Sequence, residues 1–315
     1  MERLVLGLVL LAGPPAVGSP LYQRGLSPIK EVAMDMAPNS FDDQYEGCSH
    51  MMEEELPELN RTEFLTNSIY AKAWTRAAEE WRKQQHHVPM PPGLRSEHAV
   101  ALMAYTTERY LFEAFNMAVR EAGRSRQEYL HVFQFKTLHF LLSQALRTLR
   151  SAETHCRCHR VYRGVRNISF TAQPNQSVRF GHFTSTSISK EISKNFGNDT
   201  TFTVETCCGA LIRDFSFFRS EEEILIPPSE IFQVTNFTRA GQRSLIQLRS
   251  QGAKSNFNCE LVKEKRCGTA PCAFGGTEPR DPCCGAASAG PAPALTGSSA
   301  LWGLLLAALA AVGGP

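Results

Sequence analysis

Residues 218–228, Phe-Arg-Ser-Glu-Glu-Glu-Ile-Leu-Ile-Pro-Pro, place three consecutive carboxylates directly before a short apolar strand. Side chains alternate between the two faces of an extended chain, so Glu221 and Glu223 are expected on one face and Glu222 on the other. Two acids on one face suit chemistry at a sugar carbon, because one can stabilise an oxocarbenium-like centre while the other orients or deprotonates the attacking group. For these residues taken alone, the alternative is a solvated acidic turn.

The chain around this stretch changes character near residue 150. Before that point apolar residues recur at helical intervals in segments 64–77, 111–119 and 129–149. The last segment is so rich in Phe and Leu that it is expected to be the central buried helix. Later residues predict one short helix at 190–196 and short strands at 160–165, 178–184, 201–206, 223–226, 231–237, 244–249 and 257–262. The sequence therefore predicts an α+β fold with its helices first.

Composition and motifs exclude several classes of function. With 33 basic and 31 acidic side chains, the chain lacks the strong positive field of a dedicated nucleic-acid-binding protein. No Gly-x-Gly-x-x-Gly motif opens a βαβ unit, so the Rossmann mode of dinucleotide binding is not expected. The nine histidines and ten cysteines show no repeated metal-ligand interval, and no metal site is expected.

Both ends of the chain indicate export and lipid anchoring. Residues 1–18 have the charged start, apolar stretch and small-residue cleavage site of a signal peptide. Residues 285–315 combine small residues, a spacer and an apolar stretch with no basic residue after it, which is the order of a GPI-anchor signal. The attachment residue is expected among Gly285 to Ser288, and a secreted low-complexity tail or a tail-anchored helix is the alternative. We expect the protein at the cell surface, or secreted or lumenal.

The remaining residues, 19–284, fit one catalytic domain with a helical part (28–150), a strand-rich part (156–262) and a cysteine-containing tail (263–284). In an oxidising compartment the cysteines are expected to form disulfides. Five Asn-x-Ser/Thr acceptors predict glycosylated surface positions: Asn60, Asn167, Asn175, Asn198 and Asn236.

Three pieces of the strand-rich half share an order with a known family: Val161-Tyr162-Arg163-Gly164, then residues 183–187 (Phe-Thr-Ser-Thr-Ser), then Glu221-Glu222-Glu223. Arg, then Ser-Thr-Ser, then Glu-x-Glu resembles the signature of arginine-specific mono-ADP-ribosyltransferases. The likeness extends through residues 39–45, 119–126, 135–140 and 223–228, and covers residues 30 to 272. With both end signals, the chain resembles the vertebrate GPI-linked NAD(P)(+)–arginine ADP-ribosyltransferases, a family of ecto-enzymes.

The resemblance implies a helical amino-terminal half packed on a mostly antiparallel, two-sheet NAD-binding core that disulfides staple. It implies transfer of ADP-ribose from NAD, with NADP as an open second co-substrate, to the guanidino group of arginine, with release of nicotinamide. The implied acceptors are extracellular or lumenal proteins with exposed arginines and small guanidines such as agmatine, and a monomer is expected. Two rival functions stay open: an NAD glycohydrolase with water as acceptor, and a catalytically silent surface recognition protein.

Four residues form the catalytic set that the resemblance implies. Glu223 matches the glutamate that engages the nicotinamide ribose and supports positive charge at the anomeric carbon. Glu221 matches the acid that confers arginine specificity, since a carboxylate binds a guanidinium well. Arg163 would hold the phosphate and ribose region of NAD, and Ser185 would hydrogen-bond to the nicotinamide ribose or help hold Glu223.

Two further residues are expected to bind NAD by the same resemblance. Gly164 would let the backbone come close to nicotinamide, and its alternative is a simple kink at the strand end. Phe196 matches an aromatic residue that packs on nicotinamide, and its alternative is packing in the core. Residues 214–219 correspond to a loop that presents the target protein, with Arg219 placed to influence which arginines approach.

The resemblance also supplies part of the disulfide framework. It pairs Cys48 with Cys259 and Cys158 with Cys207, and Cys267 with Cys272 would close a small loop. Of the four cysteines that remain, Cys156, Cys208, Cys283 and Cys284, a bridge from Cys156 to Cys208 is one candidate. Adjacent cysteines on a strand point in different directions, so sequence leaves open which member of Cys207-Cys208 takes which partner.

Overall fold

The computed structural model describes residues 29–267, except 108, 154 and 156, together with residues 274 and 284. The predicted signal peptide and anchor signal lie outside the described residues. Within this part of the chain, no helix is both long enough and apolar enough to span a bilayer.

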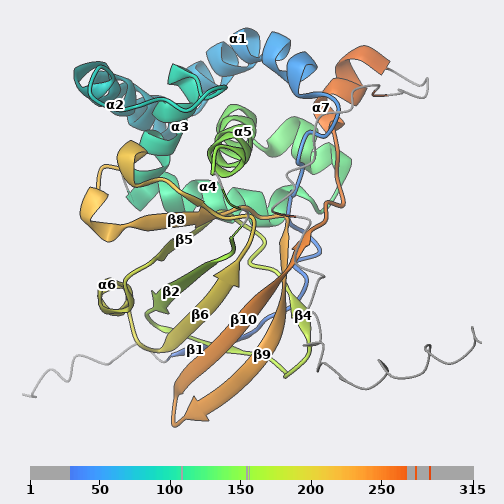
Figure 1. The fold of residues 1–315 in the computed structure, drawn as a ribbon. Helices are drawn as coiled ribbons and strands as arrows, with labels where there is room; N and C mark the ends of the chain where they lie inside the picture. Colours follow the sequence, from blue (N-terminus) through green and yellow to red (C-terminus); the bar gives the residue numbers. More distant parts are fainter. Residues whose placement is uncertain are drawn as a thin grey trace, which may run out of the picture.

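The helices of the amino-terminal half form one layer, and the strands lie below them in Figure 1. Helix α5 lies in the middle of this layer and is buried along most of its length. The layer consists of α1 (Ser49–Thr66), α2 (Ser68–Gln84), α3 (Ser96–Thr107), α4 (Arg109–Ala122), a π-helical turn (Glu128–Val132) and α5 (Lys136–Ser151). The prediction of a central buried helix is confirmed for its second part, residues 136–149.

The helical periodicity missed two breaks, all of α3 and all but the last three residues of α1. Segment 64–77 is divided at Asn67, whose side chain accepts a hydrogen bond from the backbone of Tyr70 and thereby caps α2. Segment 129–149 is divided because the backbone is extended at Phe133. Helix α3 gave no amphipathic signal because almost every one of its side chains is buried.

The described strands form two sheets. A parallel pair joins β1 (Lys30–Ala33) to β3 (Ile168–Thr171). The large sheet has the order β4-β9-β10-β6-β2-β5-β8-β7, and all its neighbours except β10 and β6 are antiparallel. Its strands are β2 (His159–Val165), β4 (Ser177–Val178), β5 (Thr184–Ser187), β6 (Thr200–Thr206), β7 (Ala210–Leu211), β8 (Glu223–Ile226), β9 (Glu230–Ala240) and β10 (Arg243–Ala253). The mostly antiparallel core is confirmed.

The large sheet has a joint between β2 and β5. A single residue pair, Tyr162 opposite Ser187, connects these strands, whereas seven pairs connect β2 to β6. In Figure 1 β5 and β8 accordingly run across the direction of β2, β6 and β10. One buried apolar cluster fills the helical layer and reaches Phe183 and Leu225, while a second lies under β2, β6, β9 and β10. The joint therefore lies where the two halves of the molecule meet.

One of the predicted strands is wrong entirely and another in part. Residues 257–262 do not form a strand, because Cys259 takes a left-handed backbone conformation and the short helix α7 (Glu260–Val262) follows it. Segment 178–184 is interrupted at Gly181, which has a φ of +69°. Arg179 leaves the ladder there, and its guanidinium forms a buried ion pair of 2.5 Å with Asp42. The short helix is confirmed as α6 (Lys190–Lys194).

The disulfides follow the implied framework in two cases and correct it in one. Cys48 is bonded to Cys259 and Cys158 to Cys207, as expected. Cys208 is bonded to Cys284, so the candidate bridge from Cys156 to Cys208 is wrong. Because Cys207 and Cys208 face different sides of the chain, each reaches its own partner. Cys156, Cys272 and Cys283 lie outside the described residues.

Four of the predicted glycosylation acceptors are exposed: Asn167, Asn175, Asn198 and Asn236. Asn60 is half-buried in α1, and its side-chain oxygen accepts a hydrogen bond of 2.6 Å from the Tyr70 hydroxyl. The surface prediction is therefore wrong for Asn60 in part, because this amide already serves the packing of α1 against α2.

Candidate active site

The joint of the large sheet brings the predicted catalytic residues together. Ser187 lies opposite Glu223 in the β5–β8 ladder, and Ser185 lies two residues earlier on β5. From β2, the Arg163 guanidinium donates a hydrogen bond of 2.6 Å to the backbone oxygen of Ser185. Since β2 and β5 share one residue pair only, this bond helps hold the two parts of the sheet at the site.

Glu223 is a buried carboxyl group with only 5% of its surface exposed. Burial raises the pKa of Glu223 to about 7, and the charge of nearby Glu221 acts in the same direction. Hydrogen bonds from the Ser185 and Ser216 side chains, and the positive charge of Arg163, lower its pKa but do not offset burial. Glu223 thus has a protonation equilibrium near neutral pH, which is typical of functional carboxyl groups.

The three glutamates do not follow the alternation of an extended strand, and that expectation is wrong. Glu221 ends a 3-10 turn (Arg219–Glu221), and Glu222 has a left-handed backbone with a φ of +45°. Only Glu223 belongs to β8. The turn is held from β5, because the Ser187 hydroxyl donates a hydrogen bond of 2.7 Å to the backbone oxygen of Glu221. The Glu221 and Glu223 carboxyl groups are nevertheless close enough to interact electrostatically.

Glu221 is less buried than Glu223 and remains partly open to solvent. Partial burial raises the pKa of Glu221. A cationic ligand placed beside this carboxyl group would lower the pKa again and be bound in return. The arrangement therefore offers one deeply buried acid and one accessible acid on the same turn.

The helical half contributes residues that sequence motifs did not single out as site residues. Tyr105 of α3 is buried, donates a hydrogen bond of 2.9 Å to the backbone oxygen of Phe183, and accepts one of 3.1 Å from Asn116 of α4. Its phenol interacts electrostatically with Glu223. The sequence did not predict these site residues, because α3 shows no amphipathic periodicity and because Tyr105 is indistinguishable by sequence from an ordinary core aromatic residue.

Arg120 of α4 brings a second guanidinium to the site. The pKa of Arg120 is lowered by desolvation, although the residue has an exposed surface, and by the neighbouring charge of Arg163. Two arginines that repel one another are favourably neutralised by an anion, and a diphosphate is the anion that dinucleotides supply. Arg120 lies within one of the sequence stretches that carry the family resemblance, so position alone could have suggested it.

Gly164 makes a close backbone contact with the segment that carries Phe196. A Cβ atom at Gly164 would lie 2.3 Å from the backbone oxygens of Ser193 and Gly197. Glycine is therefore required at this position for α6 to pack against β2, a role in addition to any contact with a ligand. Phe196, at the end of α6, has 49% of its surface exposed and does not belong to the core.

The loop before the glutamates is held against α2 by two contacts. The Arg219 guanidinium donates a hydrogen bond of 2.5 Å to the Gln84 side chain, and the Arg76 guanidinium lies 5.4 Å from the centre of the Phe217 ring. Phe218, which lies between them, has 51% of its surface exposed. The loop thus presents an aromatic side chain to solvent directly beside Glu221.

No group of three or more potential ligands among the described residues is arranged to hold a metal ion. The geometry instead combines two arginines, two serines and two carboxyl groups around one turn. This set can bind an anion, hydrogen-bond a sugar and stabilise a developing positive charge.

Comparisons with known proteins point to one family. The family model described as NAD:arginine ADP-ribosyltransferase matches residues 34–256. The erythroblast NAD(P)(+)–arginine ADP-ribosyltransferase of Gallus gallus is 55% identical over 270 residues, which are 86% of this chain and 89% of that protein. The GPI-linked NAD(P)(+)–arginine ADP-ribosyltransferase 1 of Homo sapiens is 46% identical over 285 residues, which are 86% and 87% of the two chains.

Solved structures agree with the sequence relatives. The crystal structure of the eucaryotic mono-ADP-ribosyltransferase ART2.2 is 38% identical, has a TM-score of 0.64, and matches 72% of this chain and 98% of that chain. Another ART2.2 structure, a mutant in complex with NAD, is 37% identical with a TM-score of 0.64.

Proposed function

The chain belongs to the NAD:arginine ADP-ribosyltransferase family, and from this premise we propose that Glu223 and Glu221 divide the two halves of its reaction. The enzyme transfers ADP-ribose from NAD to arginine and releases nicotinamide. The observation that carries the assignment is the pairing of a buried carboxyl group, Glu223, with an accessible one, Glu221, on a single turn.

Glu223 would act on NAD. As the bond to nicotinamide breaks, positive charge develops at the anomeric carbon of the ribose. An ionised carboxylate in a buried site stabilises that charge strongly, because little water screens it. Ser185 and Ser216 favour the ionised form of Glu223, and its burial beneath the turn limits the approach of water.

Arg163 and Arg120 would bind the diphosphate of NAD through charge-assisted hydrogen bonds. One N–H group of Arg163 already donates a hydrogen bond to the backbone oxygen of Ser185, and this bond fixes the direction of the guanidinium. Phe196, exposed at the end of α6, would pack its ring on nicotinamide. Since the names of the curated relatives include NAD(P), we propose that NADP is also accepted.

Glu221 would bind the acceptor guanidinium and take up its proton as the nitrogen attacks the anomeric carbon. Attack opposite the departing nicotinamide inverts the configuration, so β-NAD would give an α-linked ADP-ribosyl-arginine. The same geometry fits a protein arginine and a small guanidine such as agmatine. We propose that one monomeric domain, residues 19–284, suffices for the reaction.

The experiment supplies labelled NAD to the purified protein, with and without agmatine, beside a Glu223→Gln variant. We expect ADP-ribosyl-agmatine and nicotinamide from the wild type, and very little of either from the variant. Hydrolysis of NAD without transfer would favour the glycohydrolase, and absence of any turnover would favour a silent recognition protein. Undiminished turnover by Glu223→Gln would contradict the role of Glu223.

We also propose that the protein is exported and held at the cell surface by a lipid anchor attached among Gly285 to Ser288. The names of the Homo sapiens and Mus musculus relatives describe GPI-linked enzymes. Treatment of cells with a phosphatidylinositol-specific phospholipase C should release the enzyme into the medium. Retention on the membrane after this treatment would contradict the anchor.

A further inference from the structure

The disulfide between Cys208 and Cys284 joins the catalytic sheet to the residue immediately before the proposed anchor site. Cys208 follows the last residue of β6, Thr206, by two positions. Gly252 of β10 lies against the same segment, since a Cβ atom there would come within 3.0 Å of the Cys284 backbone oxygen. Cys284 is therefore fixed at the end of the sheet where β6 and β10 finish.

The attachment point of this disulfide on the sheet is held firmly. The Glu230 carboxyl group accepts hydrogen bonds from the backbone nitrogens of Cys207 and Cys208, at 2.8 and 3.2 Å. It also accepts one of 2.6 Å from the Ser250 hydroxyl of β10. Glu230 is completely buried, so the turn that carries Cys208 is part of the sheet rather than a loose loop.

The anchor would then begin very close to the sheet. Gly285 to Ser288 follow Cys284 by one to four residues, which span at most about 14 Å when fully extended. If the disulfide were absent, the 17 positions from Cys267 to Cys284 could extend over roughly 56 Å. The disulfide thus shortens the tether between the sheet and the lipid several-fold.

Resting on the proposed anchor, we propose that this end of the sheet is the membrane-facing surface of the enzyme and that the bridge from Cys208 to Cys284 sets its orientation. The partner of the surface is the layer of phosphate-bearing lipid head groups. A lipid-linked residue held against one end of a rigid sheet leaves little freedom for the domain to turn over.

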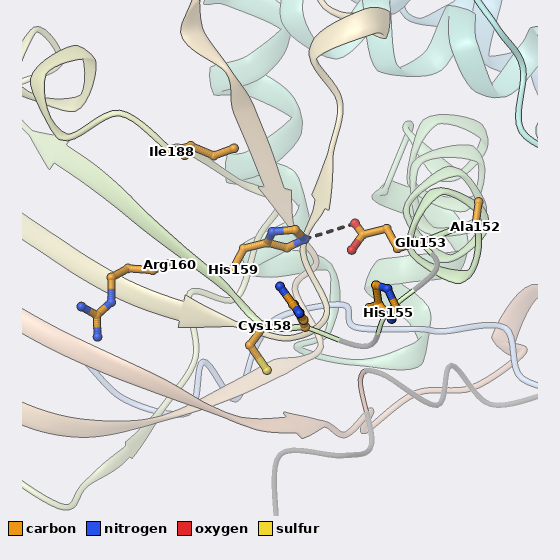
Figure 2. A pocket seen from close by; sticks show the side chains of 8 residues that line it. Ala152, Glu153, His155, Cys158, His159, Arg160 and Ile188 are labelled. Carbon is orange, nitrogen blue, oxygen red and sulfur yellow. Dashed lines mark hydrogen bonds and ion pairs between the residues drawn. The ribbon is translucent and has the colours of Figure 1, made fainter.

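A pocket with several charged side chains in its wall lies beside the segment that carries Cys208 (Figure 2). It has a volume of about 600 Å³, and Cys158, the partner of Cys207, lies in its wall. Glu153, which also lines this pocket, is already paired with His159 at 3.1 Å and with buried Arg150. Exposed Arg157 has no ion pair with any described carboxylate. A surface with unpaired positive charge suits contact with lipid phosphates.

The orientation places the catalytic turn near the membrane. Arg163 lies opposite Phe202 on β6, six residues before Cys208, which corresponds to roughly 20 Å along the strand. The enzyme would therefore reach arginines in the membrane-proximal parts of neighbouring proteins more readily than arginines far from the bilayer.

The test uses the full chain, anchored in the membrane, with a fluorescent amino acid at Gln251 or at Gln242 and an energy acceptor in the lipid. Both positions are exposed, and they lie near opposite ends of β10, roughly 30 Å apart. We expect at least several-fold more energy transfer from Gln251 than from Gln242. Equal transfer from both, or more from Gln242, would overturn the proposed orientation.

A Cys208→Ser/Cys284→Ser double variant tests the bridge itself. The difference between the two probe positions should largely disappear, while transfer to agmatine stays at the wild-type rate and shows that the variant is folded. A difference that persists in this variant would overturn the role of the disulfide. Phospholipase release of the wild type should abolish energy transfer at both positions, and its failure would contradict the anchor rather than the bridge.

Discussion

Two buried glutamates, seven residues apart, contrast a residue that we propose for catalysis in one region with a residue that supports the fold in another. Glu223 begins β8 at the joint of the sheet, and Glu230 begins β9 at the end of the sheet that carries Cys208. Burial raises the pKa of both carboxyl groups. Burial alone therefore does not identify the catalytic residue.

The neighbours of the two carboxyl groups make the difference. Glu230 accepts hydrogen bonds from two backbone nitrogens and from the hydroxyls of Thr206 and Ser250, at 2.5 to 3.2 Å. Glu223 faces Glu221 and Arg163, both only partly buried and both able to meet a ligand. A carboxyl group that is fully satisfied by its own protein stabilises the fold, whereas one beside open charged groups can act on a substrate.

The largest expected effect is on catalysis at Glu223. Glu223→Gln keeps the shape of the side chain and removes the charge, so transfer to agmatine should fall by about 10²- to 10³-fold, the typical loss when one group that stabilises the transition state is removed. The free energy of unfolding should not decrease, because ionised Glu223 is costly to bury. A variant that loses stability instead of activity would place Glu223 in the structural class of Glu230.

The next effect is on stability at Glu230. Glu230→Ala leaves two backbone nitrogens and two hydroxyls without their acceptor, which should lower the free energy of unfolding by about 3 kcal/mol or more. Chemical denaturation measures this loss. The folded fraction should still transfer ADP-ribose at a rate close to that of the wild type. A large loss of activity in correctly folded protein would remove the contrast between the two glutamates.

The pH dependence separates the two roles further. The pKa of Glu223 is about 7 in the folded protein and about 4.5 when unfolded, so the folded state binds more protons between these values. Stability should fall as pH rises from about 4.5 to about 7, and kcat/KM for NAD should rise with an apparent pKa near 7. Glu223→Gln should abolish the pH dependence of kcat/KM in that window and reduce that of stability, to which Asp43 and Glu230, whose pKa values burial also raises, still contribute. A wild-type activity profile that is flat from pH 5 to 8 would contradict the raised pKa.

The smallest effect concerns the loop beside Glu221. Gln84→Ala removes the hydrogen bond to Arg219 in an exposed setting, so stability should change by less than about 0.5 kcal/mol. We expect KM for protein acceptors to rise about two- to fivefold, because one lost hydrogen bond corresponds to about 0.5–1 kcal/mol. The kinetics with agmatine should not change. An equal change for both kinds of acceptor would show that Gln84 acts on the turn itself.

Much of the site could be predicted from the sequence because its residues lie in short contiguous motifs. Arg163, Ser185 and Glu223 occupy neighbouring strands, and period-two patterning finds most of those strands. The pairing of Cys158 with Cys207 followed from the family resemblance and is present in the structure.

Other features depended on contacts that sequence does not display. Tyr105 and Asn116 reach the site from helices, and α3 is hidden by its own complete burial. The left-handed conformation of Glu222 breaks the strand pattern without a glycine to signal it. Glycine is required at position 164 because α6 packs closely against β2, and this contact between elements is not displayed by the sequence. The partner of Cys208 is 76 residues away, and no local pattern predicts it.

The most direct measurement is the ratio of ADP-ribosyl-agmatine to free ADP-ribose formed by a Glu221→Gln variant. If Glu221 serves the acceptor and Glu223 serves NAD, this ratio should fall at least about 10-fold while nicotinamide release continues, since an amide neither binds a guanidinium as well nor accepts its proton. An unchanged ratio, or complete loss of nicotinamide release, would contradict the division of labour between the two carboxyl groups.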